Sequence, residues 1–128
     1  MATTVCDYAL PKNVDDGEKK TSMLIPVNQR KLVFDFVLPP GTQRGERAIL
    51  SFMLHTTGAD DLKFHFEIGG HVQSYLINSD VTRVFQEIVG PDVLNVTQLD
   101  DNSVTFLPTS GDGVLGISDV VLWFQRAL

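Results

Sequence analysis

Cysteine is nearly absent from this sequence. Cys6 is the single cysteine among 128 residues, so neither an intrachain disulfide nor a zinc–thiolate cluster can form. The N-terminal stretch lacks the basic start and apolar run of a signal peptide, and no apolar stretch approaches the length of a membrane span. These absences lead us to expect a soluble, cytoplasmic protein that keeps its thiol reduced.

Basic residues are also scarce and scattered. Ten Lys and Arg stand against 16 Asp and Glu, which gives a formal net charge of −6. The longest basic run is the pair Lys19 and Lys20. A protein that neutralises phosphate groups usually carries a basic patch, so nucleic acids and anionic membranes are not expected partners.

Catalytic motifs are missing as well. No serine lies in a Gly-x-Ser-x-Gly elbow, and "GDG" at 111–113 is a turn signal, because no helix start follows it. The acidic pairs at 60–61 and 100–101 fall in turn clusters, where solvated carboxylates are expected. We therefore expect no catalytic residue, and the chain is not expected to be an enzyme.

The chain is rich in short apolar runs that Gly, Pro, Asn and Asp residues separate. The β-branched and aromatic content of these runs, and the short spacing between the breakers, favour strands over helices. Strands are predicted at 31–38, 47–56, 62–68, 71–77, 81–89, 102–108 and 113–125. Residues 1–20 are predicted to be a polar, turn-rich lead-in, and residues 21–128 a single all-β domain.

Large apolar residues at even positions define the predicted core. Positions two apart on a strand share a face, so each even-numbered row lies on one side of its strand. These rows are Leu32, Phe34, Phe36 and Leu38; Leu50, Phe52 and Leu54; Leu62, Phe64, Phe66 and Ile68; and Val120, Leu122 and Phe124. Two sheets that meet through such rows make an antiparallel β-sandwich. A long helix through 47–55 or 81–89 would contradict this prediction.

The odd positions of the same strands are mixed in character. Their apolar members are Val33, Val37, Ile49, Met53, Val121 and Trp123. An exposed apolar surface of that extent usually marks an interface. One hypothesis is therefore a structural or assembly domain that forms a homo-oligomer through an apolar sheet face.

Three stretches near the C-terminus form a pattern: "VFQEIV", then "DNSVTFLP" with Asn102 ahead of an apolar alternation, then "GDGVLGISDVVLWFQ". Over 81–125 this pattern resembles the end of a galactose-binding-like jelly roll, the scaffold of many carbohydrate-binding modules. The resemblance implies a jelly-roll β-sandwich. It also implies a non-catalytic, lectin-like binding module with carbohydrate as the leading ligand class, although a protein ligand is the alternative on such a scaffold.

Four polar residues at odd positions of two neighbouring predicted strands are candidates for ligand binding: His55, Lys63, His65 and Glu67. We expect them to share a face, where they offer charged and hydrogen-bonding groups to a polar ligand such as a carbohydrate. The alternative is a solvated face, because charged residues that alternate along a strand usually mark solvent.

Trp123, the only tryptophan, is a further candidate, with Gln125 next to it on the same face. On an open face, Trp123 would form an apolar platform on which a sugar ring or a protein side chain stacks. The alternative is that Trp123 packs against the N-terminal segment or an adjacent strand, since tryptophan is usually largely buried.

Metal sites have weaker support. If 69–70 forms a two-residue hairpin turn, Ile68 pairs with His71, and His71 points away from His65 and Glu67, which excludes a metal site at the three. The resemblance suggests a structural calcium at Asp119, since some carbohydrate-binding sandwiches use an Asp near the last strand. Its predicted partners are Asp15, Asp16 or Glu18. The alternative is an Asp in a bulge or turn, and no other cofactor is expected.

Overall fold

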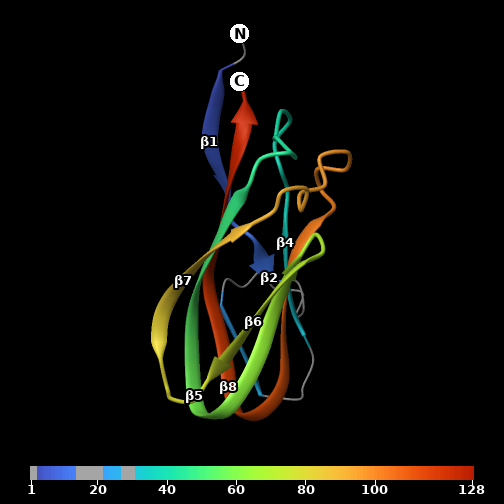
Figure 1. Ribbon diagram of the computed structural model, residues 1–128. Coiled ribbons are helices and arrows are strands. Elements are labelled where there is room, and N and C mark those ends of the chain that lie inside the picture. The colour runs from blue at the N-terminus through green and yellow to red at the C-terminus, as the bar shows by residue number, and fades with distance from the viewer. Residues whose placement is uncertain (1–2, 14–21, 27–30) are drawn as a thin grey trace.

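The computed structural model describes residues 3–13, 22–26 and 31–128, and all regular structure in them is β (Figure 1). Its strands are β1 (Thr4–Ala9), β2 (Lys12–Asn13), β3 (Ser22–Pro26), β4 (Leu32–Phe36), β5 (Ala48–Ile68), β6 (His71–Ile77), β7 (Thr82–Val89) and β8 (Asn102–Ala127). Within the described ranges, no helix is long and apolar enough to cross a bilayer. The prediction that 47–55 and 81–89 are strands is confirmed.

Two long strands, β5 and β8, form a ribbon that organises the whole fold. They pair antiparallel along nearly their full length, from Ile49 opposite Trp123 to Glu67 opposite Thr105. The ribbon turns back on itself where the register shifts, around residues 57–63, and Figure 1 shows both strands bending at the lower end of the molecule. The predicted strands 47–56 and 62–68 are therefore one strand, and so are 102–108 and 113–125.

The bend divides the ribbon between two facing sheets. We call one the β1 sheet: it contains β7, the first half of β5, the second half of β8, and β1 and β3 along the same edge of β8. The other is the β4 sheet, with β6, the second half of β5, the first half of β8, β4 and β2.

The strand order is that of a jelly roll. If β5 and β8 are each divided at the bend, the chain from β3 onward has eight strand segments. The β1 sheet contains the first (β3), the eighth (second half of β8), the third (first half of β5) and the sixth (β7), in that spatial order. The second, seventh, fourth and fifth form the long strands of the β4 sheet. Every pairing is antiparallel, so the predicted fold class, an antiparallel jelly-roll β-sandwich, is confirmed.

The predicted even-numbered rows meet between the sheets. Phe34, Phe52 and Phe64 are 0%, 0% and 1% exposed. Phe52 of the β1 sheet packs edge-on against Phe66 and Phe106 of the β4 sheet, with ring centroids 6.0 and 5.1 Å apart. Each fully buried side chain of this kind contributes about 1.5–3 kcal/mol, so this aromatic cluster is the main cohesion between the layers.

Glycine permits the ribbon to bend. Gly111 has a φ of 89°, a conformation that other residues rarely adopt. A Cβ at this position would lie 2.0 Å from the carbonyl oxygen of Asp61 on the opposing strand. The two backbones are too close here for any side chain, so the sequence "GDG" serves the bend itself.

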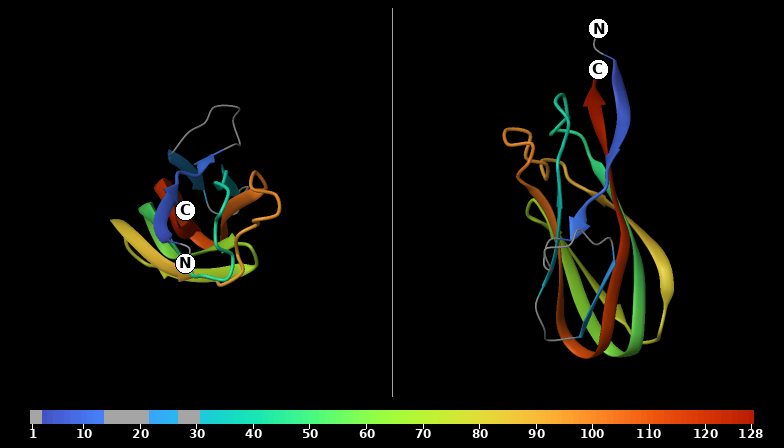
Figure 2. Two further views of the ribbon diagram at one scale, coloured as in Figure 1. Left: turned by 90° about the horizontal axis from the view of Figure 1, so that it is seen from above. Right: turned by 180° about the vertical axis from the view of Figure 1, so that it is seen from behind.

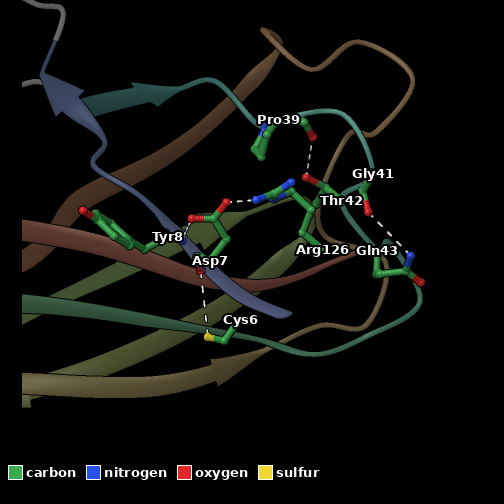
Figure 3. A network of polar contacts seen from close by, with 8 residues as sticks. All are labelled: Cys6, Asp7, Tyr8, Pro39, Gly41, Thr42, Gln43 and Arg126. Atoms are coloured by element: carbon green, nitrogen blue, oxygen red, sulfur yellow. Dashed lines mark hydrogen bonds and ion pairs between the residues drawn. The ribbon is translucent and has the colours of Figure 1, made fainter. Parts of the chain in front are cut away.

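The N-terminal lead-in contains a strand that the sequence analysis missed. β1 pairs with the end of β8, and Figure 2 shows these two segments projecting together beyond the rest of the sandwich. Arg126 on β8 donates from Nε to the Asp7 carboxylate on β1 at 2.8 Å, and the Tyr8 amide donates to the same carboxylate at 2.8 Å (Figure 3). These contacts hold the pKa of Asp7 below its ordinary value, chiefly through the Tyr8 amide.

Candidate functional site

The bend in the ribbon places the predicted site residues on opposite sides of the sandwich. Along β5 the residues that face the core have even numbers both before and after the bend, so the odd-numbered side chains of its two halves point outward in opposite directions. His55 lies on the outer face of the β1 sheet, and Lys63 lies on that of the β4 sheet. The structure thus contradicts the expectation that His55 shares a face with Lys63, His65 and Glu67.

Lys63, His65 and Glu67 form one line along β5 on the outer face of the β4 sheet. Lys63 and Glu67 are exposed, and His65 is partly buried between its neighbours. The residues opposite them on β6 are Leu76, Ser74 and Val72, in that order. Charged and polar groups therefore alternate with apolar side chains across this face, which gives a ligand both hydrogen-bonding partners and apolar contacts.

A hollow of about 270 Å³ opens on this face beside Lys63. The register of β5 against β8 shifts between Lys63 and Phe64, and the bulge leaves Thr109 outside the regular pairing. The Thr109 hydroxyl donates to the Lys63 carbonyl at 3.2 Å. The lining residues are Lys63, Phe64, Ser74, Tyr75, Leu76 and Thr109. A concave surface with apolar walls and a few polar groups is typical of small-molecule sites.

Tyr75 supports the hollow from beneath. Its ring stacks on Phe64 with centroids 5.0 Å apart, and its hydroxyl donates to Glu87 on β7 at 2.5 Å. Burial first, and the Glu87 carboxylate second, raise the pKa of Tyr75 well above its ordinary value, so the phenol keeps its proton. Because β6 and β7 belong to different sheets, this hydrogen bond joins the layers along their open side.

Trp123 and Tyr8 form an aromatic pair on the outer face of the β1 sheet, the face that also carries Gln125 and His55. The ring centroids are 5.4 Å apart. Trp123 is 39% exposed and Tyr8 is 55% exposed. Trp123 therefore packs against the N-terminal strand, as one alternative predicted, yet keeps much of its surface open. His55 lies several residues along β5 from this pair and contacts Thr82 at 3.2 Å.

A second hollow, of about 290 Å³, lies among the loops at the end of the sandwich away from the bend. It is lined by Arg44, Gly69 and residues 92–97. Arg44 and Asp92 face each other at 3.7 Å with both side chains about 60% exposed, so solvent screens this ion pair. The lining consists largely of one irregular loop, so the shape of the hollow depends on the hydrogen bonds that fix this loop.

Asn102 holds this loop, a role that the sequence analysis did not assign to it. Its buried side chain accepts a hydrogen bond from the Asn95 amide at 2.8 Å and donates to the carbonyls of Asn95 and Leu99 at 3.1 and 3.3 Å. One amide group thus satisfies three backbone groups, which explains why an Asn precedes the apolar alternation of β8.

Asp119 lies in a bulge of β8. The register against β5 shifts between Ser51 and Met53, and Asp119 has a φ of 51°. Among the described residues, no group of three or more His, Cys, Asp and Glu side chains is placed to hold a metal ion. Its predicted partners, at positions 15, 16 and 18, lie outside the described residues, so the calcium site stays a prediction.

The hairpin at 69–70 is confirmed, with Ile68 paired to His71. His71 turns inward, and its ring stacks on Phe66 with centroids 6.1 Å apart. It therefore points away from His65 and Glu67, as the sequence predicted.

Comparison with known proteins gives only distant likenesses. No protein-family model matches the chain, and no curated protein matches it in sequence. Among solved structures, it is similar to the family 11 carbohydrate-binding module of a cellulosomal cellulase of Clostridium thermocellum, at 14% identity over 95% of this chain and 85% of that chain, with a TM-score of 0.44. The CBM22-1 xylan-binding domain from Paenibacillus barcinonensis gives 13% identity, coverages of 98% and 97%, and a TM-score of 0.43.

A Bacillus endospore appendage subunit, part of a disulfide-linked pilus family, is similar at 10% identity, with coverages of 100% and 91% and a TM-score of 0.39. The matches thus include carbohydrate-binding modules, the class that the C-terminal pattern resembles. TM-scores below 0.5 carry no argument about what the chain binds, and the jelly-roll architecture rests on the strand order of this chain.

Proposed function

We propose that this chain is a non-catalytic binding module that takes a carbohydrate on the outer face of the β4 sheet, at the hollow beside Lys63. The observation that carries the proposal is the hollow itself, formed where the bulge at Thr109 interrupts the ladder. It is a concave place on the face that carries three of the polar residues predicted from the sequence, and one of these, Lys63, lines it.

The groups around the hollow suit a sugar. A sugar offers hydroxyls that donate and accept, and C–H faces that are apolar. The Lys63 ammonium can only donate and the Ser74 and Thr109 hydroxyls can both donate and accept, while the Glu67 carboxyl group, further along β5, offers an acceptor to a longer ligand. Leu76, which is 53% exposed, supplies an apolar contact. The set therefore matches a ligand with mixed hydrogen-bonding character and no net charge.

The arrangement favours an extended chain over a single ring. Alternate residues on a strand are about 6.6 Å apart, so Lys63, His65 and Glu67 span about 13 Å along β5. We expect the reducing and non-reducing parts of an oligosaccharide to lie along this line, with one sugar unit in the hollow. The Tyr75–Glu87 hydrogen bond stiffens the site beneath, so little ordering is required on binding.

A glycan array followed by isothermal titration calorimetry tests the proposal. The first probes are a mixed-linked β-1,3-1,4 tetrasaccharide, xylohexaose and β-1,4-galactotriose, the ligands in structures similar in fold. For the oligosaccharide that binds, we expect Lys63→Ala to weaken affinity by about tenfold or more, since one charge-assisted hydrogen bond is lost.

Lys12→Ala is the matched control, because Lys12 is also exposed and lies at the far edge of the same sheet, on β2. It should bind as the unchanged protein does. Absence of any glycan that binds saturably, or equal affinity of Lys63→Ala and the unchanged protein, would contradict the proposed function.

A further inference from the structure

The outer face of the β1 sheet carries few charged groups, and the proposed function does not use it. Its described outward positions on β1, β5, β7 and β8 lie in direct register, so that Ile88, Ile49, Trp123 and Tyr8 form one row across four strands. Val84 and Met53 pair on the same face in the next row but one, beyond the row of Gln86, Ser51 and Val121. Apart from Asp119 in the bulge, the described strand positions on this face include no Asp, Glu, Lys or Arg.

We propose that this face binds a second copy of the chain, so that two β1 sheets pack face to face in a two-fold dimer. The exposed apolar side chains of the face are Tyr8 (55%), Ile49 (41%), Val84 (54%), Ile88 (61%) and Trp123 (39%). With side chains of this size, these fractions amount to about 500 Å² of apolar surface on each copy.

This area is enough for a specific dimer. Two such faces in contact remove about 1,000 Å² of apolar surface from water. The polar side chains between them, such as Gln86 and Gln125, bring the total into the range of about 1,200–2,000 Å² that stable interfaces bury. The composition also fits, because interface centres are rich in Tyr, Trp and Met and poor in charged residues.

The row is complementary to itself in size. Its β1 end carries the two large aromatic rings of Tyr8 and Trp123, and its β7 end carries the smaller Ile88. When the two-fold axis lies in the interface perpendicular to this row, the row of the second copy runs in the opposite direction. The aromatic end of each copy then lies over the aliphatic end of its partner.

Charge favours a second copy over a different protein. With a net charge of −6, this chain attracts basic partners to acidic surfaces, and the described strand positions of this face offer only Asp119. A second copy carries the same excess of negative charge, which opposes contact through the acidic parts of the surface. Contact through this face lets two copies meet with most of their carboxylates pointing away from each other.

Sedimentation-velocity and light-scattering measurements of the full chain across a concentration series test the dimer. We expect a species of twice the 14.2 kDa chain mass that dissociates on dilution. Because Trp123 is the only tryptophan and lies in the proposed interface, its emission should shift to longer wavelength over the same dilution. This readout involves no glycan, so it stands or falls separately from the carbohydrate proposal.

Two valines on edge strands give a matched pair of variants. Val84 on β7 is 54% exposed within the proposed interface, and Val72 on β6 is 52% exposed on the outer face of the other sheet. Val84→Lys places two unpaired ammonium groups in each dimer, so we expect its dissociation constant to rise about 100-fold or more. Val72→Lys should dimerise as the unchanged protein does, and circular dichroism should show both variants folded.

Ile88→Lys is the second interface variant, should Val84→Lys fail to fold. An unchanged protein that is monomeric at every concentration would overturn the proposal. So would a dimer that Val84→Lys or Ile88→Lys leaves intact, or an oligosaccharide that shifts Trp123 emission directly, since a sugar would then occupy this face.

Discussion

The two outer faces of this sandwich are built from the same two strands, yet they differ in charge. On the outer face of the β4 sheet, β5 contributes Lys63, His65 and Glu67 at its outward positions. On that of the β1 sheet, the same strand contributes Ile49 and Met53. Both halves of β5 supply apolar side chains to the interior, among them Leu50 and Phe52 before the bend and Phe64 and Phe66 after it. The outward residues therefore distinguish a charged face with a hollow from one that is mostly apolar.

This difference shows how one folded ribbon carries two independent surfaces. A β-strand exposes every second residue, so its outward positions can change without altering the core. The bend at 57–63 then turns these positions to opposite sides of the molecule. We propose ligand binding for one side and self-association for the other.

Disrupting the bend that separates the two faces should cause the largest loss of stability. Gly111→Ala would place a Cβ 2.0 Å from the Asp61 carbonyl and would require a left-handed conformation of alanine. We expect a loss of about 3 kcal/mol or more in the free energy of unfolding, measured by urea titration. Gly45→Ala is the control, because no atom lies within 4 Å of its added Cβ, and it should change stability by less than about 0.5 kcal/mol.

Breaking the link between the two layers should have an intermediate effect. Tyr75→Phe leaves the inward-facing Glu87 carboxylate without its hydroxyl donor, which should cost about 1–3 kcal/mol by urea unfolding. Tyr8→Phe, which removes an exposed hydroxyl on the β1 sheet, should cost almost nothing. Equal stability of the two variants would show that the Tyr75–Glu87 contact does not join the layers.

The same contact predicts a pH dependence. The pKa of Tyr75 is raised in the folded state, so the unfolded chain loses its phenolic proton first as the pH increases. The stabilisation is therefore complete below the ordinary tyrosine pKa of about 10 and declines above it. The unchanged protein should lose more stability between pH 8 and pH 11 than Tyr75→Phe does, and identical losses would contradict the assignment.

The smallest effect is expected at the projecting end of the β1 sheet. Asp7→Asn weakens the pairing of β1 with β8, so Tyr8 should lie less firmly against Trp123 and the tryptophan emission should move to longer wavelength. The pKa of Asp7 is lowered in the folded state, so this stabilisation is present at neutral pH and is lost as the pH falls below about 4. Asp35→Asn, on the outer face of the other sheet, should leave the emission unchanged.

The core could be predicted from the sequence because the period of two survives the bend. Phe52 and Phe64 are both even-numbered, and both are buried although they belong to different sheets. The sequence pattern could not show, however, that outward residues before and after the bend lie on opposite outer faces of the sandwich. "TGADD" indicates a turn between two strands, and nothing in its letters shows that the ladder continues through it with its direction reversed.

The strand β1 was missed because its pairing is distant in sequence. Thr4–Ala9 is short and includes the polar residues Thr4 and Asp7, and its partner on β8 lies more than a hundred positions away, as the Arg126–Asp7 contact records. Local patterns cannot reveal such a partner. For the same reason, Trp123 could be placed on a face, but its aromatic neighbour Tyr8 could not be named.

The position of β8 at the centre of both sheets has a consequence for biogenesis. This strand pairs with β1, β3, β4 and β5, so each of those strands lacks this neighbour until Asn102–Ala127 has been synthesised. Among the described residues, β1 and β3 pair only with β8, so the β1 sheet cannot be completed before β8 has left the ribosome. Dependence on contacts this remote in sequence slows the acquisition of native structure.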